Sequence, residues 1–159
     1  MTARRTAWAR SPFSRLSDDQ LDAAFQQAVV GPVRFLQRIV PGMVERRFGR
    51  IVNITSGAVK APIDILGLSN GARAGLTGFI AGLSRKTVVN NVTINNLLPG
   101  SFDTDRLRQT IQAVADKSGR SFDEVAAERA GGNPAGRFGD PVEFGEACAF
   151  LCRDRKSVV

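Results

Sequence analysis

Hydrophobic positions recur along the chain with the spacing of helices over long stretches. Apolar residues fall every three or four positions across residues 18–47, which is typical of one buried face of an α-helix. Ser17 and Gln20 spell a capping box at its start. Gly31 and Pro32 predict a bend or interruption within it. Further helices are expected over residues 66–88, 103–118, 121–130 and 140–151.

Two short β-branched segments stand between these helices and are expected to be strands. Residues 50–56 and 92–98 are nearly continuous in apolar character, as strands buried on both faces are. A helix between two strands is the pattern of a βαβ unit, in which the strands are parallel. The expected fold class is therefore α/β, with two parallel strands and flanking helices.

Four glycines mark one face of the helix expected over residues 66–88. Gly71, Gly75, Gly78 and Gly82 are separated by four, three and four positions, so they lie along one stripe. Each glycine inside a helix costs about 1 kcal/mol relative to alanine. Because glycine has no side chain, the stripe is a smooth face that another backbone can approach closely.

Composition excludes several classes of function. The chain has 159 residues, enough for one domain, and it contains neither His nor Tyr. A Ser-His-Asp triad, a His-ligated metal and a phenol acid are therefore excluded, and we expect no metal site. Cys148 and Cys152 lie one helical turn apart and are expected to be buried free thiols, which fits a reducing, cytoplasmic location. No stretch is long and apolar enough to suggest a membrane span.

The net charge of +7 raises the alternative of a nucleic-acid partner. The arginines are scattered, however, and aromatic residues do not interleave with them. We therefore do not expect nucleic-acid binding, and a steep salt dependence of DNA affinity would argue for it.

Polar and turn residues follow both expected strands, at the edge where open α/β sheets bind ligands. Ser56 ends the first strand, Pro99 and Gly100 follow the second, and Thr104 comes four positions later. Each signal alone is typical of a cap or a turn. Together they lie in segments that resemble the short-chain dehydrogenase/reductase family, particularly 3-oxoacyl-[acyl-carrier-protein] reductase-like members. These segments are residues 49–56, 68–79, 92–104 and 136–151.

The resemblance implies a truncated Rossmann-like three-layer fold over residues 1–153, with NAD(P) as the hydride carrier. It implies interconversion of a carbonyl, of 3-oxoacyl type, and an alcohol on a small-molecule substrate. Ser56 falls on the family's catalytic Ser. The family's proton-donating Tyr precedes its active-site Lys by four positions, and our alignment places Leu66 and Asn70 there. The family's helix Asn falls near Ala28.

The cofactor residues implied by the resemblance cover one end of NAD(P) only. Pro99, Gly100 and Thr104 match the family's Pro-Gly-x-x-x-Thr, which contacts the nicotinamide, and Ile54 would line the same pocket. No G-x-G-x-x-G motif occurs in the sequence, and the family's first four strands and last strand have no counterpart. We therefore expect the isolated chain neither to bind NAD(P) well nor to catalyse the reaction.

The alternative is a pseudo-enzyme or non-catalytic dimerisation module. In the family, the counterparts of the helices over 18–47 and 66–88 usually build a dimer interface, so a homo-oligomer is expected. Residues 154–159 replace the strand with which the family continues, and we expect them to be a non-native tail.

Overall fold

The computed structural model describes residues 15–153, so the tail proposed at 154–159 lies outside the described residues. The chain divides into two compact units. The first comprises Met1–Leu98 together with Leu151–Val159, and the second comprises Pro99–Phe150. Each unit has its own core and is described by itself.

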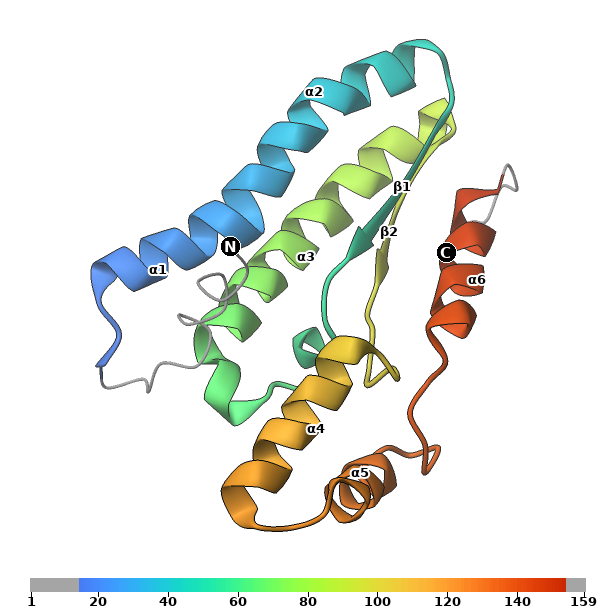
Figure 1. Cartoon of the computed structure of the whole chain (residues 1–159). Helices are drawn as coiled ribbons and strands as arrows, with labels where there is room; N and C mark the ends of the chain where they lie inside the picture. Colours follow the sequence, from blue (N-terminus) through green and yellow to red (C-terminus); the bar gives the residue numbers. More distant parts are fainter. Residues whose placement is uncertain (1–14, 154–159) are drawn as a thin grey trace. The chain divides into compact units, whose positions relative to one another are not determined.

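A long helical segment opens the first unit (Figure 1). It consists of α1 (Asp18–Phe25), a π-helical turn (Gln26–Val30) and α2 (Gly31–Glu45). The capping box at its start is confirmed, because Ser17 and Gln20 each accept a hydrogen bond from the other's backbone N–H. The predicted interruption takes the form of the π-helical turn, which ends immediately before Gly31.

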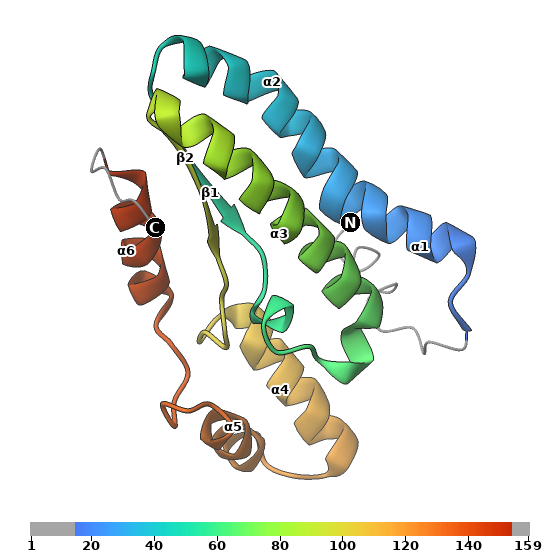
Figure 2. The same cartoon turned by 180° about the vertical axis from the view of Figure 1, so that it is seen from behind.

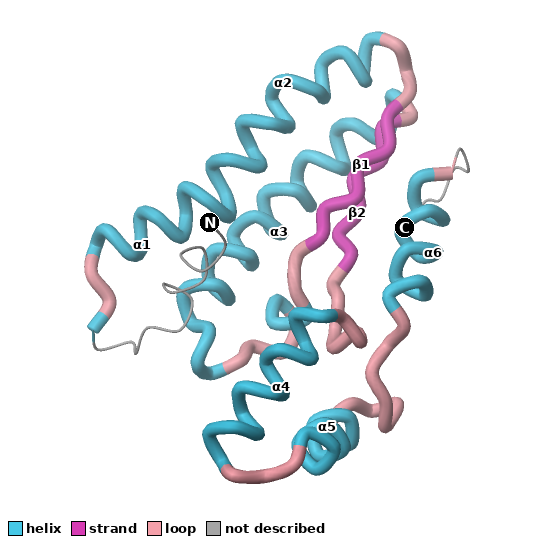
Figure 3. Tube along the Cα trace, in the orientation of Figure 1, coloured by secondary structure: helices cyan, strands magenta, loops and turns pink. Residues whose placement is uncertain are grey.

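Two parallel strands follow, joined by a long helix. β1 (Gly49–Ile54) pairs with β2 (Val92–Leu97), in a register that runs from Gly49 opposite Val92 to Ile54 opposite Leu97. The connection is α3 (Gly67–Thr87), and α2 and α3 lie side by side along the strands (Figures 1 and 2). The predicted α/β arrangement of two parallel strands and flanking helices is confirmed, as Figure 3 shows by colour.

The core of the first unit lies where α2 and α3 meet the strands. Its buried side chains come from three elements: Leu36, Val40, Leu76, Ile80 and Ile94. The burial expected throughout residues 50–56 was wrong at Ile54, which ends β1 and is 54% exposed. Each strand has a single neighbouring strand within residues 15–153, so the strands are not enclosed on every side.

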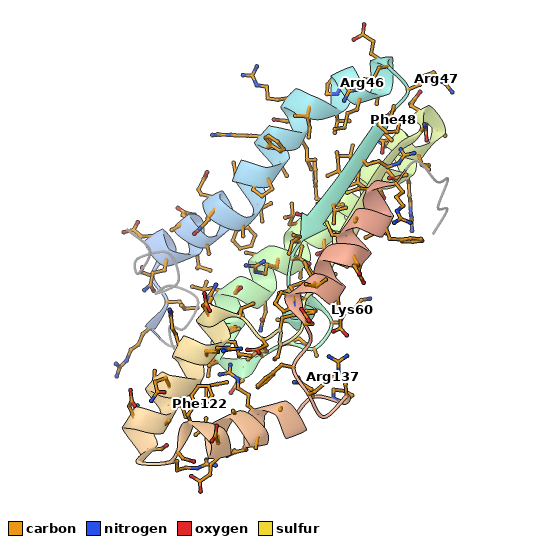
Figure 4. The ribbon with its side chains drawn as sticks, turned by 45° about the vertical axis from the view of Figure 1, so that its right-hand side comes forward. Arg46, Arg47, Phe48, Lys60, Phe122 and Arg137 are labelled. Atoms are coloured by element: carbon orange, nitrogen blue, oxygen red, sulfur yellow. The ribbon has the colours of Figure 1, made fainter. Side chains whose placement is uncertain are left out.

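A polar clamp joins the beginnings of the two strands. Arg50 donates from Nη1 to the Asn91 carbonyl at 2.7 Å and from Nη2 to Asn91 Oδ1 at 3.0 Å. Asn91 adopts a left-handed conformation, with φ of 57°, and its Nδ2 donates to the Arg47 carbonyl. The centroid of the Phe48 ring lies 4.8 Å from the guanidinium carbon of Arg50, at the turn labelled in Figure 4.

The second unit is helical. It contains α4 (Asp105–Ser118), α5 (Phe122–Gly131) and most of α6 (Pro141–Cys152), close to the predicted ranges. Ile111, Ala115 and Val125 form its buried core, against which Phe122 packs. Phe122 is labelled at the start of α5 in Figure 4.

Side-chain caps begin the helices of this unit, and one expectation about α6 needs correction. Asp140 Oδ1 accepts from the Val142 N–H at 2.8 Å, as the Asp-Pro start of α6 predicts. Cys148 and Cys152 are free thiols, but Cys148 is only half-buried and Cys152 is exposed, so the expected burial was wrong. No helix in the described part of the chain is long and apolar enough to cross a membrane.

Candidate functional site

The carboxyl ends of β1 and β2 lie at the same edge of the sheet. The Thr55 N–H donates to the Leu97 carbonyl at 3.0 Å, which extends the ladder one residue beyond Ile54. Ser56 comes next, with an extended backbone, and its Oγ accepts from the Ala58 N–H at 3.2 Å. This bond occupies a lone pair of the hydroxyl, and no side chain or carbonyl within residues 15–153 accepts the Ser56 proton.

Leu66 and Asn70, aligned with the family's Tyr and Lys, lie at the start of α3. Leu66 is the residue before the helix and has no proton to transfer. Asn70 Nδ2 donates to the Ile63 carbonyl at 2.8 Å, which fastens α3 to the loop that follows β1. Asn70 Oδ1 is buried and has no hydrogen-bond partner in the described structure. Their assignment to the Tyr and Lys positions stays a prediction.

Sequence reasoning missed a second pair with the same spacing, Ser69 and Arg73. Arg73 Nε donates to Ser69 Oγ at 3.1 Å, and Arg73 Nη1 donates to the Thr55 carbonyl at 2.8 Å. The guanidinium thus connects the first turns of α3 to the residue immediately before Ser56. The available signal was a Ser four positions before an Arg, on the helix that follows the strand-end Ser.

The charge of Arg73 is not balanced by a carboxylate anywhere in residues 15–153. The side chain is half-buried, and its two acceptors are a neutral hydroxyl and a neutral carbonyl. Thr55 is 6% exposed, and its Oγ1 has no hydrogen-bond partner in that part of the chain. The strand edge therefore combines a positive charge with polar atoms that are not satisfied by the protein.

The expected nicotinamide contacts are divided between the two units. Ile54 belongs to the first unit, whereas Pro99, Gly100 and Thr104 belong to the second. Thr104 Oγ1 accepts from the Leu107 N–H at 3.3 Å and so caps α4. A Cβ built on Gly100 would meet no atom within 4 Å, which leaves open space at that position. Their contact with a nicotinamide stays a prediction.

Two further expectations concern the helix Asn and metal ions. Ala28, near the family's helix Asn, lies in the π-helical turn and carries no polar side chain. Among the residues that the structure describes, no group of three or more His, Cys, Asp or Glu side chains could hold a metal ion.

A parallel βαβ unit with polar groups at the carboxyl edge of its strands defines the Rossmann-like class of α/β proteins. Comparison with known proteins narrows the class. Residues 2–159 match the family described as enoyl-(acyl carrier protein) reductase. The chain is 32% identical over 152 residues to subunit BbsC of the (2S)-[(R)-hydroxy(phenyl)methyl]succinyl-CoA dehydrogenase of Thauera aromatica, covering 91% of this chain and 52% of that protein.

Two further relatives agree. The chain is 30% identical over 139 residues to the 3-oxoacyl-[acyl-carrier-protein] reductase FabG of Vibrio harveyi, covering 86% of this chain and 52% of FabG. The crystal structure of a 3-oxoacyl (acyl-carrier-protein) reductase from Agrobacterium tumefaciens C58, with NADP bound, matches with a TM-score of 0.74 and 30% identity. That match covers 89% of this chain and 52% of the reductase.

The chain therefore belongs to the short-chain dehydrogenase/reductase family. It spans about half the length of these relatives. The truncated Rossmann-like fold implied by the sequence is confirmed by these similarities.

Proposed function

We propose that this protein takes part in the NAD(P)-dependent interconversion of a carbonyl and an alcohol, on a small molecule of 3-oxoacyl type. The observation that carries the proposal is the position of Ser56 at the carboxyl edge of β1, where its hydroxyl accepts one hydrogen bond and donates none to the described part of the chain. Further support comes from relatives named as 3-oxoacyl-[acyl-carrier-protein] reductases and acetoacetyl-CoA reductases. In this role the Ser56 hydroxyl donates a hydrogen bond to the substrate's carbonyl oxygen.

The residues of this chain suit the nicotinamide end of the cofactor and not its pyrophosphate. Ile54 at the end of β1 is 54% exposed and offers apolar surface to a ring. When bound, NAD(P)H supplies a hydride. A pyrophosphate needs a glycine-rich turn at a helix N-terminus, and Gly57–Val59 and Asp64–Leu66 after β1 are single 3₁₀ turns instead. We therefore propose that the isolated chain is inactive.

The reaction can be tested in a completed chain, in which a relative's N-terminal strands and last strand are joined to this sequence. We expect NADPH oxidation with an acetoacetyl thioester. Ser56→Ala should lower its kcat about 10²–10³-fold, the usual effect of removing a donor to a developing oxyanion. Ser84→Ala, on the distant part of α3, is the matched control and should leave kcat unchanged. Equal rates with and without the Ser56→Ala substitution would refute the role given to this hydroxyl.

A second candidate is a non-catalytic dimerisation module, which one observation favours. A Cβ built on Gly71, Gly78 or Gly82 meets no atom within 4 Å, so the described chain leaves three of the four glycines of the stripe uncovered, whereas a Cβ on Gly75 would lie 3.8 Å from Phe25 Cε1. In this proposal a second copy packs its backbone against the stripe. Size-exclusion chromatography separates the two candidates: a clean dimer supports the module, and aggregation supports an incomplete enzyme.

A further inference from the structure

We propose that Arg73 and Ser69 form a binding site for a negatively charged oxygen atom of a small molecule. The site lies at the carboxyl edge of β1, where Arg73 reaches the carbonyl of Thr55. The proposal rests on the proposed function in one respect: the oxygen would belong to the substrate, as its carboxylate or as the charge that develops on its carbonyl.

The geometry of Arg73 fixes its guanidinium in place. Nε is held by Ser69 Oγ at 3.1 Å and Nη1 by the Thr55 carbonyl at 2.8 Å, so both edges of the planar group are anchored. A guanidinium carries five N–H donors, and these two bonds use two of them. The structure gives no acceptor within residues 15–153 for Nη2. A positioned guanidinium with free donors is suited to carboxylates and other oxyanions.

The charge of Arg73 points to the same kind of ligand. A guanidinium remains protonated at any physiological pH, and a partly buried charge without a counter-ion is unfavourable. Arg137 in the second unit shows the usual alternative, because Glu143 pairs with it at 2.8 Å although the arginine is exposed to solvent. Arg73 is less exposed and has no such carboxylate in the described chain. An anionic ligand would supply the missing counter-charge.

The Ser69 hydroxyl adds a donor beside the guanidinium. Ser69 is 8% exposed, and its lone pair is already engaged by Arg73, so its own proton is left for another acceptor. A hydroxyl polarised by a guanidinium is a stronger donor than an isolated one. Thr55 Oγ1 is buried without a partner in that part of the chain, on the residue whose carbonyl holds Arg73. Fixed donors around a positive charge are the arrangement that stabilises an oxyanion.

The alternative is a purely structural clamp, in which Arg73 only fastens α3 to β1. The two interpretations differ in whether a ligand protects the guanidinium. The complete 159-residue chain would be treated with phenylglyoxal, which modifies arginines, and each site would be followed by mass spectrometry. The probes are butyrate, which is anionic, acetoacetate, which is anionic and carries a ketone, and 2-butanone, which is neutral.

We expect butyrate and acetoacetate to slow modification of Arg73 about tenfold at about ten times their Kd, as simple occupancy dictates. Arg85 is the matched control, because it lies on the same helix but is exposed in its last turn, and its rate should not change. 2-Butanone should protect neither arginine. Modification of Arg73 at the same rate with and without either carboxylate would overturn the proposal.

A second measurement covers the case in which Arg73 resists the reagent. Butyrate binding by calorimetry should weaken at least about tenfold in Arg73→Lys, which keeps the charge but loses the planar fork. Ser69→Ala should weaken it as well. Arg85→Lys and Ser84→Ala serve as controls and should bind like the original chain. Absence of butyrate binding, or equal binding by all four variants, overturns the proposal.

These tests use no nicotinamide cofactor, so they are independent of the proposed function. Protection of Arg73 by carboxylates, together with a completed chain that reduces no carbonyl, would refute the proposed function and leave the anion site standing. Carbonyl reduction by the completed chain, without any protection of Arg73 by carboxylates, would refute the anion site and leave the proposed function standing.

Discussion

Replacing the three open glycines of α3 with alanine should stabilise the folded chain. Gly71, Gly78 and Gly82 lie inside the helix, and a Cβ at any of them meets no atom within 4 Å. Glycine costs about 0.8–1.0 kcal/mol relative to alanine in a helix interior, so three substitutions should add about 2.4–3.0 kcal/mol to the free energy of unfolding. For a chain of this size that corresponds to a rise in Tm of roughly 5–12 °C.

The assay is urea unfolding followed by circular dichroism, at protein concentrations low enough to keep the chain monomeric. Gly49→Ala is the control and should lower the free energy of unfolding, because its Cβ would fall 2.6 Å from Met43 Sδ. A lower midpoint for the triple variant in dilute solution would refute the reasoning, since it would mean that something covers the glycine stripe within the monomer.

The same variant tests the expected homo-oligomer. If the glycine stripe packs against a second copy, three added methyl groups separate the two backbones and weaken self-association, although each monomer is more stable. Sedimentation velocity would show this as a lower association constant. Unchanged association would place any interface elsewhere on the chain.

Three further predictions concern the second unit and the cofactor. Gly139→Ala should destabilise the chain by about 1–3 kcal/mol in thermal unfolding, because the new Cβ would lie 2.6 Å from Phe102 Cε1. Hydrogen bonds from the Arg137 guanidinium and the Asp140 N–H hold the pKa of Glu143 below its ordinary 4.5. The unfolded chain is therefore protonated first, and stability should fall as the pH drops below about 4.5, with a smaller slope in Glu143→Gln. Calorimetry of the isolated chain should detect no micromolar NADPH binding.

The elements of this fold were predictable because their signals are local. The capping box at Ser17 and the Asp-Pro start at Asp140 fix helix beginnings within a few neighbouring positions, and both are present. Burial was less predictable, because it depends on what lies beside an element. Ile54 and Phe79 have the apolar character of core residues, yet about half of each side chain is exposed.

In the candidate site too, residues marked by their sequence neighbours could be predicted, and residues defined by contacts between elements could not. Ser56 could be predicted, because it follows a β-branched segment at the edge where such sheets bind ligands. The role of Arg73 could not, because its anchor is the Thr55 carbonyl on a different element. The i, i+4 relation of Ser69 and Arg73 is visible in the sequence, but a Ser and an Arg one turn apart are common on helix surfaces. Only the fold shows that this pair meets the strand end.

Two pairs of residues at the start of α3 have the spacing of the family's Tyr and Lys: Leu66 with Asn70, and Ser69 with Arg73. Asn70 already uses its amide to bind the Ile63 carbonyl, whereas Arg73 bonds both Ser69 and the strand end. The second pair is therefore better placed to act on a ligand beside β1. In the completed chain, Leu66→Tyr with Asn70→Lys follows our sequence alignment, and Ser69→Tyr with Arg73→Lys follows the geometry.

A correctly placed acid raises a rate about 10²–10⁴-fold, so one double variant should reduce carbonyls much faster than the other. We expect the Ser69 and Arg73 positions to give the gain, because the strand-end contact that orients the second residue exists only there. Measuring kcat for both double variants with the same thioester, alongside the unsubstituted completed chain, decides between the positions. A gain with Leu66→Tyr and Asn70→Lys alone would show that the alignment, and not the hydrogen-bond geometry, identifies the acid.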